Sequence, residues 1–177
     1  MSSDLLAPGD SDGEITIECS GVEALGQKVV SNGYNPVFTI GYQGRSPQGF
    51  CEALNANGVS VVVDVRLTPW SRRPGFAKTA LAAALAQAGI RYVHEPTLGN
   101  PKDNREAFQG DDVEMGRAIF RMHMAQVGGE ALQRIADLVG SEGVALVCME
   151  SAATRCHRQV VADALLEMGA TMEVVTL

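Results

Sequence analysis

The chain has 177 residues, a net charge of −7 and a hydrophobic content of 46%, which is ordinary for a globular protein of one domain. No apolar run approaches the roughly 20 residues that a membrane-spanning helix needs, so we expect no membrane partner. The first residues lack the basic start and the apolar block of a secretory signal. We therefore expect a cytoplasmic protein whose four cysteines are reduced thiols.

The charge is distributed unevenly along the chain. Residues 1–35 hold six acidic residues and one basic residue, whereas residues 36–177 hold 15 acidic and 13 basic residues. The larger part is thus almost neutral, which gives no overall sign of a nucleic-acid-binding protein. Of the 14 basic residues, 11 are arginines. Arginine suits bidentate binding of phosphate or carboxylate, although a GC-rich coding sequence favours it as well.

The first elements in the chain are the least regular. Residues 1–13 are small, acidic and interrupted by proline and glycine, and we interpret them as a flexible acidic tail. The next segment, 14–35, is ambiguous, since it begins with an alternating pattern like that of an edge strand and continues with a possible short helix. We assign 14–177 to a single domain whose regular core is 36–177.

From residue 36 onward, apolar runs alternate with amphipathic segments. A strand at 37–41 is followed by a helix that Ser46 caps, Pro47 starts and Asn57-Gly58 ends. The β-branched run 59–65 predicts a strand that is covered on both faces. The remaining expected elements are a helix at 77–89, a strand at 90–95, helices at about 111–126 and 129–140, a strand at 143–148, a helix at 155–168 and a strand at 171–177.

This alternation predicts a single three-layer α/β/α domain with a mainly parallel sheet of about five strands. In such sheets, ligands bind beyond the carboxyl ends of the strands. The chemically capable residues at or just after those ends are Tyr42, Arg45, Asp64, Arg66, Arg72, Arg73, His94, Cys148 and Glu150. An alternative for one pair is structural, because Asp64 and Arg66 could form an ion pair across the end of the sheet.

Three glycines close to these strand ends are expected to be essential to the backbone. They are Gly41, Gly44 and Gly75. Turns beside a ligand commonly need a positive φ or a close approach of two backbones, and glycine permits both.

Five sequence motifs at these positions resemble one known family. They are TIGYQGRSPQGF, VVVDVR, SRRPGF, IRYVHEPTLGN and LVCMESAATRCHRQVVADAL. Together they resemble domain of unknown function 488 (DUF488) over residues 38–177, with Asn100 where the family more often has a glycine. The resemblance implies the α/β fold and a shared site built from these motifs, but it implies no particular reaction.

The start of the last helix carries a concentration of basic residues. With Thr154 as the N-cap, the first turn would hold Arg155, Cys156, His157 and Arg158. Cations at this end oppose the helix dipole, whereas the free N–H groups there favour an anion. We therefore expect an anion site that these cations share with the arginines after the second strand, although Asp64 or Glu150 could neutralise the cations instead.

Either of two cysteines near this helix start, Cys148 or Cys156, could act as a nucleophile. Cys156 lies beside basic residues, which lower the pKa of a thiol, whereas Cys148 closes a buried strand and is typical of an inert core cysteine. A metal site is not expected. Adjacent Cys156 and His157 on a helix would point about 100° apart, and the sequence has no C-x-x-C pair.

We therefore expect an enzyme that acts, without a cofactor, on an anionic small molecule that is phosphorylated or nucleotide-like. The candidate catalytic residues are Asp64, Glu150, Cys156 and His157, with the carboxylates as base or nucleophile and His157 or His94 as proton donor. The candidate binding residues are Tyr42, Arg45, Arg66, Arg72, Arg73, His94, Arg155 and Arg158. Two alternatives remain open: a nucleic-acid-binding or processing module that uses the same residues, and a non-catalytic scaffold.

Overall fold

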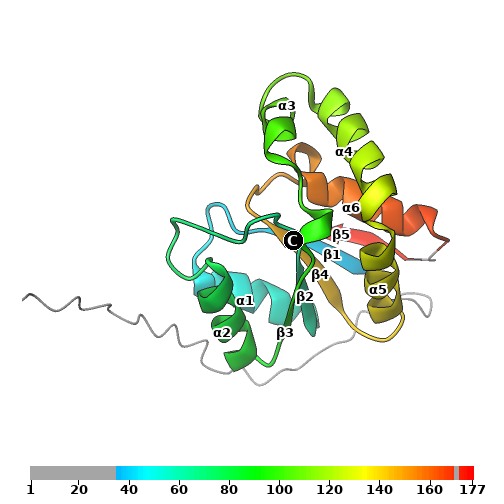
Figure 1. Ribbon diagram of the computed structural model, residues 1–177. Helices are drawn as coiled ribbons and strands as arrows, with labels where there is room; N and C mark the ends of the chain where they lie inside the picture. Colours follow the sequence, from blue (N-terminus) through cyan, green and yellow to red (C-terminus); the bar gives the residue numbers. More distant parts are fainter. Residues whose placement is uncertain (1–34, 170–171) are drawn as a thin grey trace, which may run out of the picture.

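The computed structural model describes residues 35–169 and 172–177, which form a five-stranded sheet between two layers of helices (Figure 1). The strand order is β3-β2-β4-β1-β5, and each pair of neighbouring strands is parallel. The expected α/β class and parallel sheet are thus confirmed. The predicted acidic tail 1–13 and nearly all of the ambiguous segment 14–35 lie outside the described residues.

The elements follow the expected order along the chain. The strands are β1 (Val37–Gly41), β2 (Val61–Asp64), β3 (Arg91–His94), β4 (Val144–Cys148) and β5 (Val174–Thr176). The helices are α1 (Pro47–Ala56), α2 (Lys78–Gln87), α3 (Arg105–Gln109), α4 (Val113–Val127), α5 (Gly129–Val139) and α6 (His157–Glu167). None of the helices in the described part of the chain combines the length and the apolar character needed to span a bilayer.

Different helices bury the two faces of the sheet (Figure 1). Successive residues of a strand point to opposite faces, so a continuous run of valines needs a cover on both sides. Val62 of β2 belongs to a core with α1 and α2, whereas its neighbours Val61 and Val63 belong to a core with α4, α5 and α6. In β4, Cys148 faces the second of these cores, and this orientation places its thiol on the side of α6.

The structure confirms one predicted helix cap, contradicts another and contains one helix that the sequence did not predict. The Ser46 side chain caps α1, accepting a hydrogen bond from the Gly49 N–H at 3.1 Å, as expected. The expectation that Thr154 caps the last helix was wrong. Thr154 lies in a 3-10 turn, Ala153–Arg155, and the N-cap of α6 is Cys156 in an extended conformation (φ −137°, ψ 142°). The short helix α3 was also missed, because its segment was interpreted as a loop.

The carboxyl ends of the central strands meet at one edge of the sheet. Gly41 pairs in register with Cys148, and Asp64 pairs with both Val147 and His94. The pairing continues past the strands, since the N–H groups of residues 42 and 43 donate to the carbonyls of residues 148 and 149 at 3.3 and 2.9 Å. The segments that leave β1, β2, β3 and β4 therefore start from one surface.

The three glycines expected to be essential do have special backbone requirements. Gly44 and Gly75 have φ values of 83° and 84°, in the left-handed region that side chains disfavour. Gly41 has a different constraint, since a Cβ atom built on it would lie 1.8 Å from the carbonyl oxygen of Glu150. The sequence prediction is thus confirmed, and Gly41 permits the close approach of β1 to the segment that follows β4.

We predict that Gly41→Ala lowers the free energy of unfolding by about 3 kcal/mol or more, because the added methyl group must displace backbone. Gly44→Ala is the matched control. It has open space around its Cβ position, so it should cost only the about 1–2 kcal/mol of a left-handed alanine. Urea unfolding measures both variants, and equal losses would contradict the steric argument for Gly41.

Candidate functional site

A buried ion pair lies at the carboxyl end of β2. Asp64 is fully buried, and its carboxylate accepts hydrogen bonds from Nε and Nη2 of Arg66 at 2.8 and 2.6 Å and from the Tyr92 hydroxyl at 2.7 Å. Arg66 also donates through Nη1 to the Phe76 carbonyl at 2.9 Å and to the Tyr42 hydroxyl at 3.3 Å. This network links the ends of β1, β2 and β3 to the segment before α2.

The ion pair sets the charge state of its members. Burial alone would lower the pKa of Arg66, but the hydrogen bonds and the charge of Asp64 hold that pKa above its ordinary value. Burial and the hydrogen bond to Asp64 raise the pKa of Tyr92, so Tyr92 remains a neutral donor. Asp64 is therefore enclosed by its partners and does not line the cavity described below. This arrangement agrees with the alternative in which Asp64 and Arg66 form a structural ion pair.

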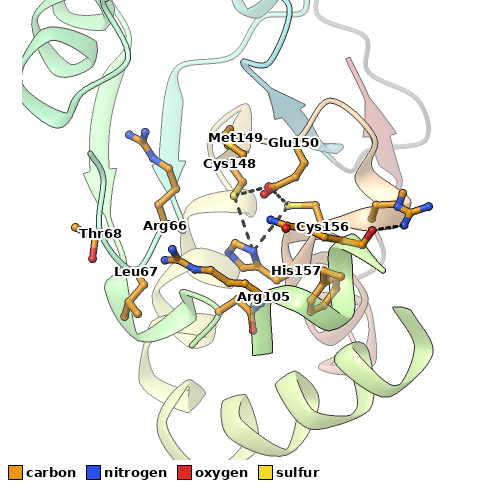
Figure 2. Close-up of a pocket in the computed structure, with 13 residues that line it drawn as sticks. Arg66, Leu67, Thr68, Arg105, Cys148, Met149, Glu150, Cys156 and His157 are labelled. Atoms are coloured by element: carbon orange, nitrogen blue, oxygen red, sulfur yellow. Dashed lines mark hydrogen bonds between the residues drawn. The ribbon is translucent and has the colours of Figure 1, made fainter. Parts of the chain in front are cut away.

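A cavity of about 160 Å³ opens at the same edge of the sheet, beside the ion pair (Figure 2). Its inner wall is formed by Cys148 at the end of β4, by Glu150 in the loop that follows, and by Cys156 and His157 at the start of α6. The other lining residues come from the segment after β2, from Asn100 and from α3. Four of the residues that the sequence singled out thus meet in one place.

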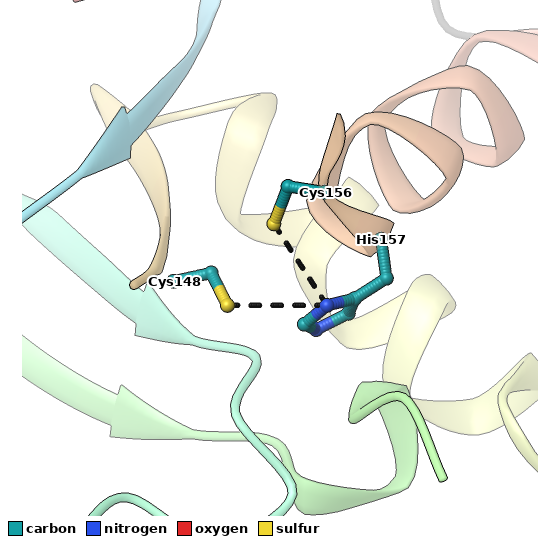
Figure 3. A group of neighbouring side chains, drawn as sticks. All are labelled: Cys148, Cys156 and His157. Carbon is teal, nitrogen blue, oxygen red and sulfur yellow. Dashed lines mark hydrogen bonds between the residues drawn. The ribbon is translucent and has the colours of Figure 1, made fainter. Parts of the chain in front are cut away.

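The inner wall brings two thiols, a carboxylate and an imidazole into contact. The Glu150 Oε2 atom accepts hydrogen bonds from the Cys148 and Cys156 thiols, with S···O distances of 3.0 and 3.1 Å. The His157 Nδ1 atom lies 3.9 Å from the Cys148 sulfur and 3.8 Å from the Cys156 sulfur (Figure 3). The side chains of Cys156 and His157 converge because the Cys156 backbone is extended and the His157 backbone is helical.

A backbone carbonyl fixes the orientation of the His157 ring. The Nε2 atom lies 2.8 Å from the carbonyl oxygen of Val65, the residue after β2. A carbonyl oxygen can only accept, so Nε2 carries a proton and donates it. The Nδ1 atom therefore faces the two thiols, and the imidazole is 7% exposed.

The electrostatics of the inner wall differ from the sequence-based expectation. Burial alone would raise the pKa of Glu150, but the hydrogen bonds from the two thiols and the neighbouring His157 lower the pKa below its ordinary value. Burial and the contact with Cys148 raise the pKa of the Cys156 thiol well above its ordinary value. Cys156 is thus not the low-pKa thiol that its basic sequence neighbours indicated.

The basic neighbours of Cys156, Arg155 and Arg158, donate hydrogen bonds to backbone carbonyls and not to the Cys156 thiol. Arg155 lines the outer part of the cavity and donates through Nη2 to the carbonyls of Gln109 and Gly110 at 2.8 and 2.7 Å. Arg158 is fully buried and donates through Nη1 to the Glu150 carbonyl and through Nη2 to the Ser151 carbonyl at 2.9 Å. Arg158 does not line the cavity, so the cluster of free cations expected at the helix start does not form.

One basic residue at the mouth of the cavity was missed by sequence reasoning. Arg105 is the first residue of α3, is exposed, lines the cavity, and makes no hydrogen bond or ion pair with the described residues. It follows the motif IRYVHEPTLGN by five residues, in a segment interpreted as a loop, and the packing of α3 against α4 places it at the cavity. The rim therefore carries Arg66, Arg105 and Arg155, against the single carboxylate of Glu150.

The remaining candidate binding residues lie near the edge but do not line the cavity. Tyr42 stacks on the Phe76 ring with a centroid distance of 4.6 Å and is 2% exposed. The ring of His94 is held between the Arg66 carbonyl, 2.9 Å from Nε2, and the Lys78 amine, 3.3 Å from Nδ1.

Three further arginines of the prediction lie on the loop surface. Arg73 donates through Nη2 to the carbonyl of Arg45 at 3.0 Å, which ties the loop after β2 to the loop after β1. The guanidinium carbon of Arg72 lies 5.7 Å from the centre of the Trp70 ring, whose residue is 64% exposed. We call these residues, Arg45, Trp70, Arg72 and Arg73, the loop surface. None of them lines the cavity.

The geometric argument against a metal does not apply to the folded chain. It assumed that Cys156 and His157 are both helical, but the helix begins only at His157. The candidate ligand atoms of Cys148, Cys156 and His157 all lie within 4.8 Å of one another. In the described part of the chain, these three residues could bind a metal ion.

A sequence model of one protein family, domain of unknown function DUF488, matches residues 46–165, about two thirds of the chain. The chain belongs to the DUF488 family. The matched segment contains every residue of the cavity, whereas β1 and β5 of this DUF488 protein lie outside it. No curated protein and no solved structure matches the chain.

We predict that Asp64→Asn lowers the free energy of unfolding by about 3–5 kcal/mol, because Arg66 then keeps a buried charge without its partner. The matched control is Glu142→Gln, which removes the partner of Arg91 in an ion pair whose side chains are 50% and 32% exposed. An exposed pair is worth at most about 1 kcal/mol. Urea unfolding of the two variants compares them directly, and losses of similar size would contradict the structural role of the buried pair.

A second prediction concerns Arg158. Arg158→Ala should lower the free energy of unfolding by about 3 kcal/mol, since two carbonyls lose their donor and a large buried side chain is removed. Arg155→Ala also removes hydrogen bonds to two carbonyls, but from an exposed side chain, and should cost about 1 kcal/mol or less. Thermal and urea unfolding measure both variants. An Arg158→Ala variant as stable as the wild type would contradict the structural role of Arg158 and support a free cation at the helix start.

Proposed function

We propose that this DUF488 protein is an enzyme that acts on a small anionic substrate, phosphorylated or nucleotide-like, whose anionic group enters the cavity. The observation that carries the proposal is the composition of the cavity, where Glu150, Cys156 and His157 face a rim of arginines. Reactive side chains and a binding site for negative charge within one cavity are the features expected of an active site.

The rim supplies the proposed anion site. Arg105 has no partner among the described residues, so its guanidinium is available for a ligand without breaking an existing contact. Arg155 lines the same cavity and is exposed, although its Nη2 atom already donates to two carbonyls. Arginine binds phosphate and carboxylate groups through two parallel hydrogen bonds, which favours planar or tetrahedral anions as ligands.

The size of the cavity limits what it would hold. Its volume of about 160 Å³ is below the roughly 300–1,000 Å³ of pockets for drug-sized ligands. An anionic group would therefore enter, while the rest of a larger substrate would lie across Leu67 and Met149 at the mouth. These residues are 37% and 42% exposed, and they offer apolar contacts.

The inner wall supplies the proposed reacting groups. The lowered pKa of Glu150 keeps its carboxylate ionised, which suits a base or a nucleophile rather than an acid. His157, with its Nδ1 atom toward the cavity wall, is the candidate for proton transfer. Cys156 acts as a neutral thiol in this arrangement, because burial raises its pKa. Hydrolysis and group transfer are the reaction classes that these groups serve.

A specific observation also favours a second candidate, a nucleic-acid-binding module. Trp70 is 64% exposed, carries Arg72 over its ring, and lies on a loop that also holds Arg73. An exposed aromatic ring beside arginines is the arrangement that stacks a base and contacts its backbone. This loop surface is separate from the cavity, so the two candidates can be tested with different variants.

We predict that inorganic phosphate raises the melting temperature of the wild-type protein and that Arg105→Ala weakens phosphate binding by roughly 10-fold or more. A charge-assisted hydrogen bond contributes about 1.5–3 kcal/mol, and 1.4 kcal/mol corresponds to a factor of ten. The stability of the ligand-free variant should stay unchanged, since Arg105 has no hydrogen-bond or ion-pair partner among residues 35–169 and 172–177. Thermal-shift titrations at constant ionic strength measure both effects.

The control for this experiment is Arg121→Ala, a surface arginine outside the cavity whose contact with Asp163 is 4.0 Å long. It should leave phosphate binding unchanged. Phosphate binding that survives Arg105→Ala would contradict the proposed site. Binding of a single-stranded oligonucleotide that falls steeply with salt and is lost in Trp70→Ala would instead support the nucleic-acid module.

A further inference from the structure

We propose that Cys148, Cys156 and His157 bind a zinc ion, with the Glu150 carboxylate as the fourth ligand. The site shares the cavity with the proposed anion site. It does not rest on the proposed function, because metal binding requires no substrate. It reverses the sequence-based expectation of no metal, which assumed a helical Cys156.

The donor atoms are spaced close to what a tetrahedral zinc site requires. Zinc bonds of about 2.3 Å to sulfur, 2.0–2.1 Å to nitrogen and 2.0–2.2 Å to oxygen place neighbouring ligand atoms roughly 3.5 Å apart. The S···N distances to His157 are 3.9 and 3.8 Å, and the S···O distances to Glu150 are 3.0 and 3.1 Å. These values lie on both sides of the ideal spacing, so shifts of a few tenths of an ångström would complete the tetrahedron.

The orientation of His157 is a second and independent indication. The Nε2–H group donates to the Val65 carbonyl at 2.8 Å, which is the outer contact that metal-binding histidines commonly make. This contact leaves the Nδ1 lone pair toward the two sulfurs (Figure 3). A neutral imidazole held in this way presents a ligand atom to the centre of the cluster.

The cluster has only two thiol protons to share between the Glu150 carboxylate and the Nδ1 atom of His157. The two thiols have one S–H donor each, and both lie within hydrogen-bond distance of the same Glu150 oxygen. If both donate to Glu150, the buried Nδ1 atom of His157 has no donor among the described residues. A zinc ion that replaces the two thiol protons would satisfy both sulfurs, the carboxylate and the imidazole together.

The charge of the cavity is compatible with this ligand set. Two thiolates and one carboxylate with a Zn²⁺ ion leave one net negative charge. Arg105 and Arg155, whose charges have no carboxylate partner among the described residues, line the same cavity and compensate it. Glu150 is the most exposed of the four ligands, since the other three are buried, so it is the ligand that water or a substrate oxygen could replace. A zinc ion with such an open position would polarise that oxygen.

The test uses the full chain, treated with a chelator and a thiol reductant and then freed of the chelator. Titration with ZnCl₂ against a chromophoric zinc chelator should give one tightly bound ion per chain. Co²⁺ should give the intense visible bands of tetrahedral coordination and a thiolate charge-transfer band. Cys148→Ser and Cys156→Ser should each weaken zinc binding by roughly 100-fold or more, since loss of outer contacts alone costs about 10–100-fold.

The matched control is Cys51→Ser, which changes a buried cysteine in the core formed with α1 and α2. It should leave the zinc affinity unchanged, as should Cys19→Ser near the N-terminus. If the Cys148 or Cys156 variants do not fold, alkylation of the wild-type protein decides the question. Zinc should protect Cys148 and Cys156 from iodoacetamide and leave the labelling of Cys19 unchanged, as measured by peptide mass spectrometry.

Three results would overturn the proposal: no zinc binding to the reduced wild type, zinc binding that persists in both cysteine variants, or octahedral Co²⁺ without a thiolate band. Formation of a Cys148–Cys156 disulfide in a protein that binds no zinc would show a redox pair instead. Phosphate titration of the metal-free protein tests the proposed anion site separately, so the anion site and the zinc site can each fail while the other stands.

Discussion

The buried ion pair between Asp64 and Arg66 is the interaction on which the carboxyl edge of the sheet depends. Its bidentate contact closes the end of β2, while Tyr92 reaches it from β3 and Arg66 extends to the Phe76 carbonyl before α2. A charged pair with almost no exposure is stable only when its hydrogen-bonding groups are satisfied. The network meets this requirement, and it fixes the path of the chain through Val65 and Arg66, where the backbone passes beside the cavity.

That backbone path orients two histidines. The carbonyl of Val65 accepts from His157, and the carbonyl of Arg66 contacts His94. The ion pair therefore acts on the cavity through main-chain geometry, although Asp64 has no surface there. The loop after β4 is held in a similar way, because the buried guanidinium of Arg158 binds the carbonyls of Glu150 and Ser151 while Gly41 allows β1 to approach the same loop. The buried Arg66 and Arg158 thus set the shape of the cavity, and the exposed Arg105 and Arg155 line it.

The distinction between buried and exposed arginines explains why the cavity differs from a simple cluster of positive charge. Four charged side chains line it, but Arg66 is already paired and Glu150 is bonded to two thiols. Arg105 has no such partner within the described residues. The chemistry of the inner wall depends on how two thiols, one carboxylate and one imidazole share their protons. The proposed zinc ion would replace the two thiol protons.

The amino-acid sequence alone predicted the α/β fold, the parallel sheet, the edge where the cavity lies and the glycines that this edge needs. These follow from local patterns: β-branched runs, helix periodicity, the Ser46 cap, and the rule that parallel strands end at one edge. Which polar residues meet depends on long-range packing. A polar side chain near this edge can point into the cavity, as Glu150 does after β4, or into the core, as Arg158 does in α6, and local sequence does not distinguish the two. The same applies to Cys156, whose backbone is extended where a helical one was expected, and to Arg105, which reaches the cavity because α3 packs against α4.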